Sequence, residues 1–146
     1  MRIYLDCCSL QRPFDDKSKP RIAVEAEAVL VVLSLCESEE LTLVASDALY
    51  FEIGRIPDQG RKEEALAILK IVKETVELSP EIEALARRLE ASGIKPLDAL
   101  HLASASIAKV DYFCTCDDKF YKKSINFKGL YSKVVSPAEL VMEVDI

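Results

Sequence analysis

The chain has 146 residues, a length that allows one domain with a substantial core. Half of the residues are hydrophobic and 30% are charged, which argues against the disordered and fibrous classes. There are 19 Lys and Arg against 25 Asp and Glu, and the net charge of −6 argues against tight, unassisted binding to nucleic acid.

The sequence carries no pattern of membrane insertion or secretion. Its apolar runs are shorter than the roughly 18 residues of a membrane span, and Asp6 interrupts the first run before a signal peptide can form. We therefore expect a cytoplasmic protein with reduced, mostly buried thiols. The alternative is a disulfide or soft-metal site between the pair Cys7 and Cys8 and the pair Cys114 and Cys116.

Strands and helices alternate along the chain. The apolar patterns predict strands over residues 2–5, 41–45, 75–78, 112–115 and 134–135. Caps, prolines and amphipathic spacing predict helices over 21–37, from a Ser46 cap to about residue 56, over 61–74, 80–91 and 96–109, after Asp117, and from Pro137. A polar segment with Pro13 and Pro20 separates the first strand from the first helix. This order predicts one α/β domain over residues 1–146, with a parallel sheet covered on both faces.

Four acids fall where strands of such a sheet end, which is where α/β folds bind ligands. Asp6 ends the first strand, and Glu52 lies on the helix after the second. Asp98 is in the first turn of the helix that begins at Pro96, and Asp117 follows the strand 112–115 by two residues. Each acid alone also has a structural explanation. Asp6 could form a turn and Glu52 could be a solvated helix residue. Asp98 could be a favourable first-turn charge, and Asp117 could be an N-cap.

The set of acids favours a metal site over those separate explanations. Asp6 and Asp98 lie in apolar sequence, and no Lys or Arg is placed locally to pair with both. Clustered carboxylates repel each other, and an all-oxygen shell suits one or two Mg²⁺ or Mn²⁺ ions. Such a site can activate water for phosphodiester hydrolysis. A haloacid-dehalogenase-like phosphatase would need a second Asp two residues after the first, where this chain has Cys8. A receiver domain would need an acidic pair before the first helix, and Asp15-Asp16 comes too far beyond the first strand to serve as that pair.

Four motifs in order carry a family resemblance. They are Ile3-Tyr4-Leu5-Asp6, the stretch from Ser46 to Glu52, Gly93-Ile94-Lys95-Pro96-Leu97-Asp98-Ala99-Leu100-His101-Leu102-Ala103, and Phe113-Cys114-Thr115-Cys116-Asp117. Together they resemble the PIN-domain family of ribonucleases, which includes the VapC-type toxins. The resemblance implies a Rossmann-like three-layer α/β/α sandwich with a central parallel sheet. It also implies a metal-dependent endoribonuclease, with an RNA substrate and an antitoxin protein as partners.

The resemblance also assigns roles to residues. Asp6, Glu52, Asp98 and Asp117 would be the catalytic, metal-binding acids. Thr115, Ser46 and Asp118 would support them, with Asp117 preferred over Asp118 because it fits the Thr-x-Asp spacing. After the first acid the family often has a polar pair, whereas this chain has Cys7-Cys8-Ser9, so that contact is either missing or supplied by Ser9. This departure leaves an alternative open, a PIN-like binding or interaction module with weakened catalysis.

Three further features have both a functional and a structural explanation. Arg12, Lys119 and Lys122 follow proposed ligands and are candidate phosphate contacts, or simply a solvated surface. His101 lies three residues after Asp98 and is either a catalytic group or a packed core residue. The helix 21–37 is apolar on nearly all sides, which favours a homodimer.

Overall fold

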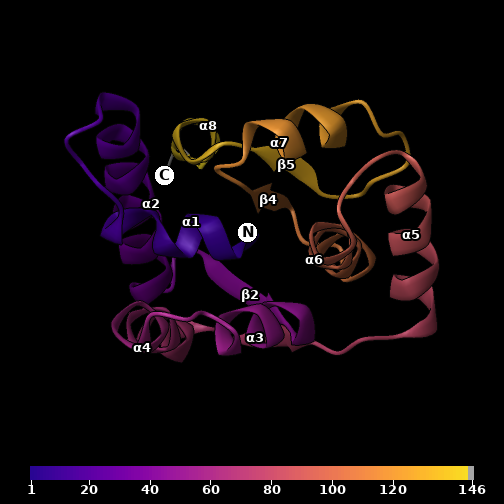
Figure 1. Ribbon diagram of the computed structural model, residues 1–146, viewed down its shortest axis with the longest axis horizontal. Helices are drawn as coiled ribbons and strands as arrows, with labels where there is room; N and C mark the ends of the chain where they lie inside the picture. Colours follow the sequence, from indigo (N-terminus) through magenta and orange to yellow (C-terminus); the bar gives the residue numbers. More distant parts are fainter. Residues whose placement is uncertain (145–146) are drawn as a thin grey trace.

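The computed structural model describes residues 1–144 and contains one five-stranded sheet, all of whose strands are parallel (Figure 1). The strands are β1 (Arg2–Leu5), β2 (Thr42–Ser46), β3 (Glu74–Val76), β4 (Tyr112–Cys114) and β5 (Lys133–Val135). Their spatial order is β3-β2-β1-β4-β5. The predicted α/β class with a parallel sheet is confirmed.

Helices connect the strands. They are α1 (Cys7–Gln11), α2 (Pro20–Glu37), α3 (Asp47–Gly54), α4 (Gln59–Ile68), α5 (Pro80–Ala91), α6 (Pro96–Ile107), α7 (Asp118–Ile125) and α8 (Pro137–Glu143), with 3₁₀ turns η1 (Arg12–Phe14) and η2 (Leu69–Ile71). Figure 1 shows α2 and α8 together on one side of the sheet and α5 and α6 on the other. This is the predicted three-layer α/β/α arrangement. Within residues 1–144 no helix is both long and apolar enough to cross a membrane.

The sheet reverses its winding direction at β1. From β1 the chain adds β2 and then β3 on one side, after which α5 and α6 carry it back to place β4 on the other side of β1. In doubly wound folds such a reversal opens a crevice at the carboxyl ends of the two strands that flank it. Here those strands are β1 and β4, which lead to Asp6 and Asp117 respectively.

The core surrounds the central strand. Ile3, Tyr4 and Leu5 are at most 1% exposed, so β1 is covered on both faces. The Tyr4 ring stacks on Phe113 of β4 at 5.2 Å between centroids, and Phe113 meets Phe120 of α7 edge-on at 5.6 Å. This aromatic column joins the central strands to the helix that begins beside Asp117, and it therefore supports the end of the sheet where the acids lie.

Local signals set the helix that carries Asp98. Ser79 caps α5 by accepting the N–H of Ile82 at 3.3 Å, and Pro80 occupies the first turn. The helix ends at Ala91, and Gly93 follows the C-cap Ser92 with a φ of 102° that is readily adopted only by glycine. Two residues then lead to Pro96, the first residue of α6. Asp98 is thereby fixed in the first turn of α6.

Two predicted segments differ in the structure. The helix predicted over 61–74 begins at Gln59, because Asp58 caps it by accepting the N–H of Arg61, and it ends at Ile68. The chain then tightens through η2, and Glu74 pairs with Val44 as part of β3, since sheet pairing overrides the helical pattern there. The polar segment after the first strand contains α1 and η1.

Candidate active site

Asp6 is held at the end of β1 in a buried position. Its side chain is the N-cap of α1, with Oδ1 accepting the backbone N–H of Ser9 at 3.0 Å. The Cys8 thiol lies 3.1 Å from the same oxygen and donates to it. Asp6 is only 3% exposed, and burial raises the pKa of its carboxyl although these hydrogen bonds oppose the shift.

The four predicted acids line a single pocket. Its wall contains Asp6, Cys7, Cys8, Glu52, Lys95, Leu97, Asp98 and Asp117, and it has a volume of about 340 Å³. The acids come from the end of β1, from α3, from α6 and from the residue before α7. The fold therefore brings the four acids that the sequence predicts as a site to the same cavity.

Asp98 lies in the pocket without an ion-pair partner among residues 1–144, although Lys95 lines the same pocket. No residue within 1–144 forms an ion pair with it, and it is partly buried. Burial and then the charge of Asp6 raise the pKa of the Asp98 carboxyl to about 6. Ionising Asp98 therefore costs more free energy in this pocket than in water, and a bound cation would offset that cost.

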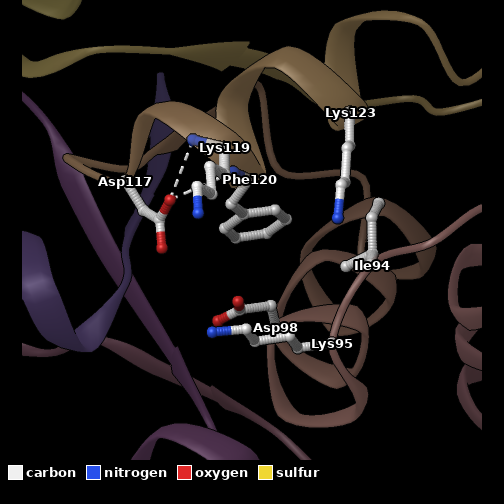
Figure 2. Close-up of a pocket in the computed structure, with 7 residues that line it drawn as sticks. All are labelled: Ile94, Lys95, Asp98, Asp117, Lys119, Phe120 and Lys123. Atoms are coloured by element: carbon white, nitrogen blue, oxygen red, sulfur yellow. Dashed lines mark hydrogen bonds between the residues drawn. The ribbon is translucent and has the colours of Figure 1, made fainter.

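Asp117 is the N-cap of α7. Its Oδ1 accepts the backbone N–H groups of Lys119 at 2.9 Å and Phe120 at 3.1 Å, as the dashed lines of Figure 2 show. The Thr115 hydroxyl accepts the N–H of Asp117 itself at 3.1 Å, which holds the turn between β4 and α7. In Figure 2 the carboxylates of Asp98 and Asp117 face the same space.

Glu52 is held by a residue from another helix. Its Oε1 lies 2.6 Å from Nε2 of His101, and His101 is completely buried in α6. From the sequence alone, His101 could be either a catalytic group or a packed core residue. The structure places it behind Glu52 and outside the residues that line the pocket.

The remaining supporting residues have varied environments. Ser46 caps α3, with Oγ accepting the N–H of Leu49 at 3.2 Å. Ser9 contacts Asp6 through its backbone N–H, whereas its hydroxyl donates to the carbonyl of Cys114 at 3.2 Å. The Asp118 carboxylate is paired with Arg21 of α2 through two contacts of 2.5 Å, and it is not among the residues that line the acid pocket.

The lysines nearest the acids are only partly those that sequence singled out. Lys95, Lys119 and Lys123 line a small cavity beside Asp98 and Asp117 (Figure 2). Lys119 was a candidate, and Lys122 lines neither cavity. The candidate Arg12 is instead paired with Asp15 at 3.0 Å and with buried Glu25 at 3.4 Å. Lys95 lines both cavities, although it was not among the candidates. Its position in the sequence, next to Pro96 and three residues before Asp98, could have identified it as a residue near the acids.

The cysteines are all free thiols. Burial raises the pKa of Cys7 to about 12, so this thiol stays protonated. Among residues 1–144 no three His, Cys, Asp or Glu side chains are close enough together to enclose a metal ion as they stand. The expectation of hydrophobe-like thiols agrees with the burial of Cys7, Cys36, Cys114 and Cys116.

Comparison with known proteins decides the family. The family model for the PIN domain matches residues 3–126. The chain belongs to the PIN-domain family. Among curated proteins, no sequence matches this PIN domain.

Two solved structures share the fold of this PIN domain. A chain of the VapBC2 crystal structure from Rickettsia felis, bound to a DNA fragment from its promoter, aligns with a TM-score of 0.56 at 14% identity. The alignment covers 92% of this chain and 99% of that one. The crystal structure of PAE2754 from Pyrobaculum aerophilum aligns with a TM-score of 0.58 at 15% identity, covering 99% and 89% respectively.

PIN domains usually use divalent metal ions, and the donor chemistry of this pocket fits such an ion. The pocket presents carboxylate oxygens, and Asp98 lacks a cation partner among the described residues. No three of the His, Cys, Asp and Glu side chains within residues 1–144 are placed to hold an ion together, so an ion here would take few protein ligands at once, as Mg²⁺ does when it keeps several of its waters. Asp6, Glu52, Asp98 and Asp117 are the residues that would hold it.

The raised pKa of Asp98 predicts how the metal-free PIN domain responds to pH. Its folded-state pKa of about 6 lies above the ordinary 3.8, so the stability that it contributes is complete below about pH 4 and is lost as pH rises through 6. In Asp98→Asn the side chain does not ionise, so the variant keeps this contribution to stability as the pH rises. In chelator, the variant should therefore become more stable than wild type by about 1–2 kcal/mol near neutral pH, a value reduced for the partial exposure of the carboxyl.

Urea unfolding of both proteins between about pH 4 and pH 8 measures this difference. Comparing the two proteins at each pH cancels the titration of carboxyls far from Asp98, and the charge of Asp6, which acts on Asp98, is part of the measured difference. A stability difference that stays constant across this range would contradict the proposed environment of Asp98. Saturating Mn²⁺ should reverse the order, because a ligand that binds only the folded wild type stabilises it.

Proposed function

We propose that this PIN domain is a metal-dependent endoribonuclease that hydrolyses RNA phosphodiester bonds, with Mg²⁺ or Mn²⁺ as cofactor. The observation that carries the proposal is the convergence of four carboxylates, from four separate segments, on one pocket at the carboxyl end of the sheet. Family membership supports a nuclease. We further propose that residues 1–146 form one such domain and act in the cytoplasm.

The chemistry divides between the bound ion and the residues of the chain. When bound, Mg²⁺ or Mn²⁺ lowers the pKa of a water and stabilises negative charge on the phosphate. Asp6 and Asp117 are fixed by backbone N–H groups at the starts of α1 and α7, and these bonds orient their carboxylates before substrate arrives. Lys95, which lines both cavities, and Lys119, which lines the small cavity beside Asp98 and Asp117, supply the positive charge that draws in the RNA backbone.

The decisive experiment is cleavage of a mixed RNA pool by the untagged chain. We expect cleavage with Mn²⁺ or Mg²⁺, none in EDTA, and recovery when the metal is restored in excess. RNA binding without cleavage under all three conditions would instead favour the weakened binding module. The Cys8 thiol is the feature behind that alternative, because it occupies a position beside Asp6 where the family often has a polar pair.

Lys95 provides a prediction about substrate binding. It borders both cavities at the acids and is exposed to solvent, so we assign it a phosphate contact. Lys95→Ala should weaken RNA binding severalfold and reduce the slope of log affinity against log salt by about one. Fluorescence anisotropy with labelled single-stranded RNA across a salt series measures both quantities. Lys70→Ala, an exposed lysine that lines neither cavity, is the matched control, and equal losses in the two variants would contradict the assignment.

Two kinds of protein partner complete the proposal. One is a second copy of the chain, because α2 exposes Val24 and Val31 in a groove that α8 also lines, and it exposes Leu30 as well. The other is an antitoxin, which would make the chain the toxin of a VapC-type pair, and the similar R. felis structure is a VapBC complex. Light scattering of the purified chain, alone and after co-expression with its operon neighbour, tests both.

A further inference from the structure

Four side chains form a continuous hydrogen-bonded line from the core to the acid pocket. Ser46 Oγ lies 2.6 Å from the Tyr4 hydroxyl, and that hydroxyl lies 2.6 Å from Nδ1 of His101. On the other side of the imidazole, Nε2 lies 2.6 Å from Oε1 of Glu52. Ser46, Tyr4 and His101 are all 0% exposed, whereas the Glu52 side chain is 33% exposed at the pocket.

The two ends of this line fix the direction of every proton in it. The backbone N–H of Leu49 donates to Ser46 Oγ at 3.2 Å, so the Ser46 hydroxyl is free to donate onward to Tyr4. At the other end the Glu52 carboxylate can only accept, so in a neutral ring Nδ1 of His101 accepts from the Tyr4 hydroxyl, which burial keeps protonated by raising the pKa of Tyr4 well above its ordinary value. A neutral His101 therefore carries its proton on Nε2 and donates it to the carboxylate of Glu52.

We propose that His101 is a positioning residue for Glu52, held in one orientation and one tautomer by Tyr4 and Ser46. The inference rests on the proposed function, because it gives Glu52 a metal to bind. One carboxylate oxygen is occupied by the imidazole, and Oε2 has no hydrogen-bond partner within residues 1–144. The line thus fixes Glu52 in the orientation in which the free oxygen serves the metal. Partners of this kind around metal ligands affect metal affinity by about 10- to 100-fold.

This role differs from both explanations that the sequence allowed. A general base needs a nitrogen that reaches the substrate, but both nitrogens of His101 are engaged and the ring does not line the acid pocket. A packed core histidine would also need a partner on each nitrogen, and the distinguishing observation is that one partner here is Glu52, an acid that lines the pocket. The line also joins β1, β2, α3 and α6, the elements whose meeting point forms one wall of the pocket.

The proton assignment can be measured directly, because His101 is the one histidine of the chain. Two-dimensional ¹⁵N–¹H spectra of the untagged, ¹⁵N-labelled protein therefore contain one imidazole, with no assignment problem. We expect the neutral ring to carry a slowly exchanging proton on Nε2 and none on Nδ1. A proton on Nδ1 alone, or an imidazole that exchanges freely with solvent, would overturn the proposal. In Tyr4→Phe the ring should lose its fixed tautomer.

Metal affinity tests the consequence for Glu52. Titration with Mn²⁺ alone, followed by electron paramagnetic resonance without RNA, should show affinity reduced about tenfold or more in His101→Leu. His101→Gln should recover part of the loss, because its amide can donate where Nε2 did. Tyr4→Phe should lose a smaller factor while keeping the ring stacked on Phe113.

Ser104→Ala is the matched control. Ser104 is a buried polar residue of the same helix, it donates only to the carbonyl of Leu100, and its loss should leave Mn²⁺ affinity unchanged. Unchanged Mn²⁺ affinity in folded His101→Leu and in Tyr4→Phe would overturn the inference and leave the proposed function standing. A wild-type chain that binds no Mn²⁺ and cleaves no RNA would overturn both.

Discussion

Replacing Asp98 by Asn should lower metal-dependent RNA cleavage by about a hundredfold or more. The substitution keeps the size and shape of the side chain and removes the charge that a divalent ion would neutralise. Metal-ion stabilisation of transition-state charge amounts to several kcal/mol, and each 1.36 kcal/mol corresponds to about a tenfold rate change. The initial rate of cleavage of labelled RNA at saturating Mn²⁺ measures the loss.

The control for this variant is Asp16→Asn. Asp16 is an exposed acid after η1 whose Oδ1 accepts the N–H of Ser18, and an Asn side chain keeps that bond. Asp16→Asn therefore removes one negative charge, as Asp98→Asn does, but at a position away from the acid pocket. The rate of RNA cleavage by Asp16→Asn should match that of the wild type. If Asp98→Asn cleaves as fast as Asp16→Asn, the acid pocket is not the catalytic site.

Phe113→Ala should destabilise the fold by about 3–5 kcal/mol, the usual range for removing a large buried aromatic side chain. Phe113 is completely buried between the rings of Tyr4 and Phe120, so truncation leaves a cavity in the middle of the aromatic column. Domains of this size have total stabilities of about 5–15 kcal/mol, so the variant loses a large part of its margin. Its urea midpoint should fall while the slope of the transition stays unchanged.

Phe51→Ala provides the comparison for that loss. Phe51 is 56% exposed on α3, and its ring lies under the guanidinium of Arg55. We expect its removal to change stability by about 1 kcal/mol or less, since little apolar area returns to water. Equal shifts of the urea midpoint in the two variants would contradict the packing described around Phe113.

The acids were predictable because each is tied to a strong local signal. Asp6 ends an apolar run, Asp98 follows a helix-starting Pro96, and Asp117 begins a capped helix, so their places in the fold follow from the order of elements. The parallel sheet then brings strand ends together. The same reasoning placed Glu52 on the correct helix, because Ser46 marks where that helix begins.

What sequence did not reveal depends on contacts between distant residues. Arg12 looked available for RNA, but Glu25 of α2 and Asp15 hold it. In the hydrogen-bonded line from Ser46 to Glu52, Tyr4 and His101 are 97 positions apart in the sequence. The residues next to His101 in the sequence therefore give no indication of this line. The start of β3 was not predicted, because Glu74 continues the apolar and polar pattern of a helix. In the structure Glu74 pairs with Val44 in the sheet, and this pairing outweighs the helical pattern.

The order of strands has a consequence for how the protein is made. The central strand β1 is synthesised first, yet one of its two neighbours, β4, follows more than 100 residues later, with Ile3 paired to Tyr112. Any fragment that stops before β4 leaves β1 with one open edge and lacks Asp117. Pairing over such long separations is slow to form. The proposed site is therefore absent from a nascent or truncated chain, and nuclease activity would report the fraction of molecules that have completed folding.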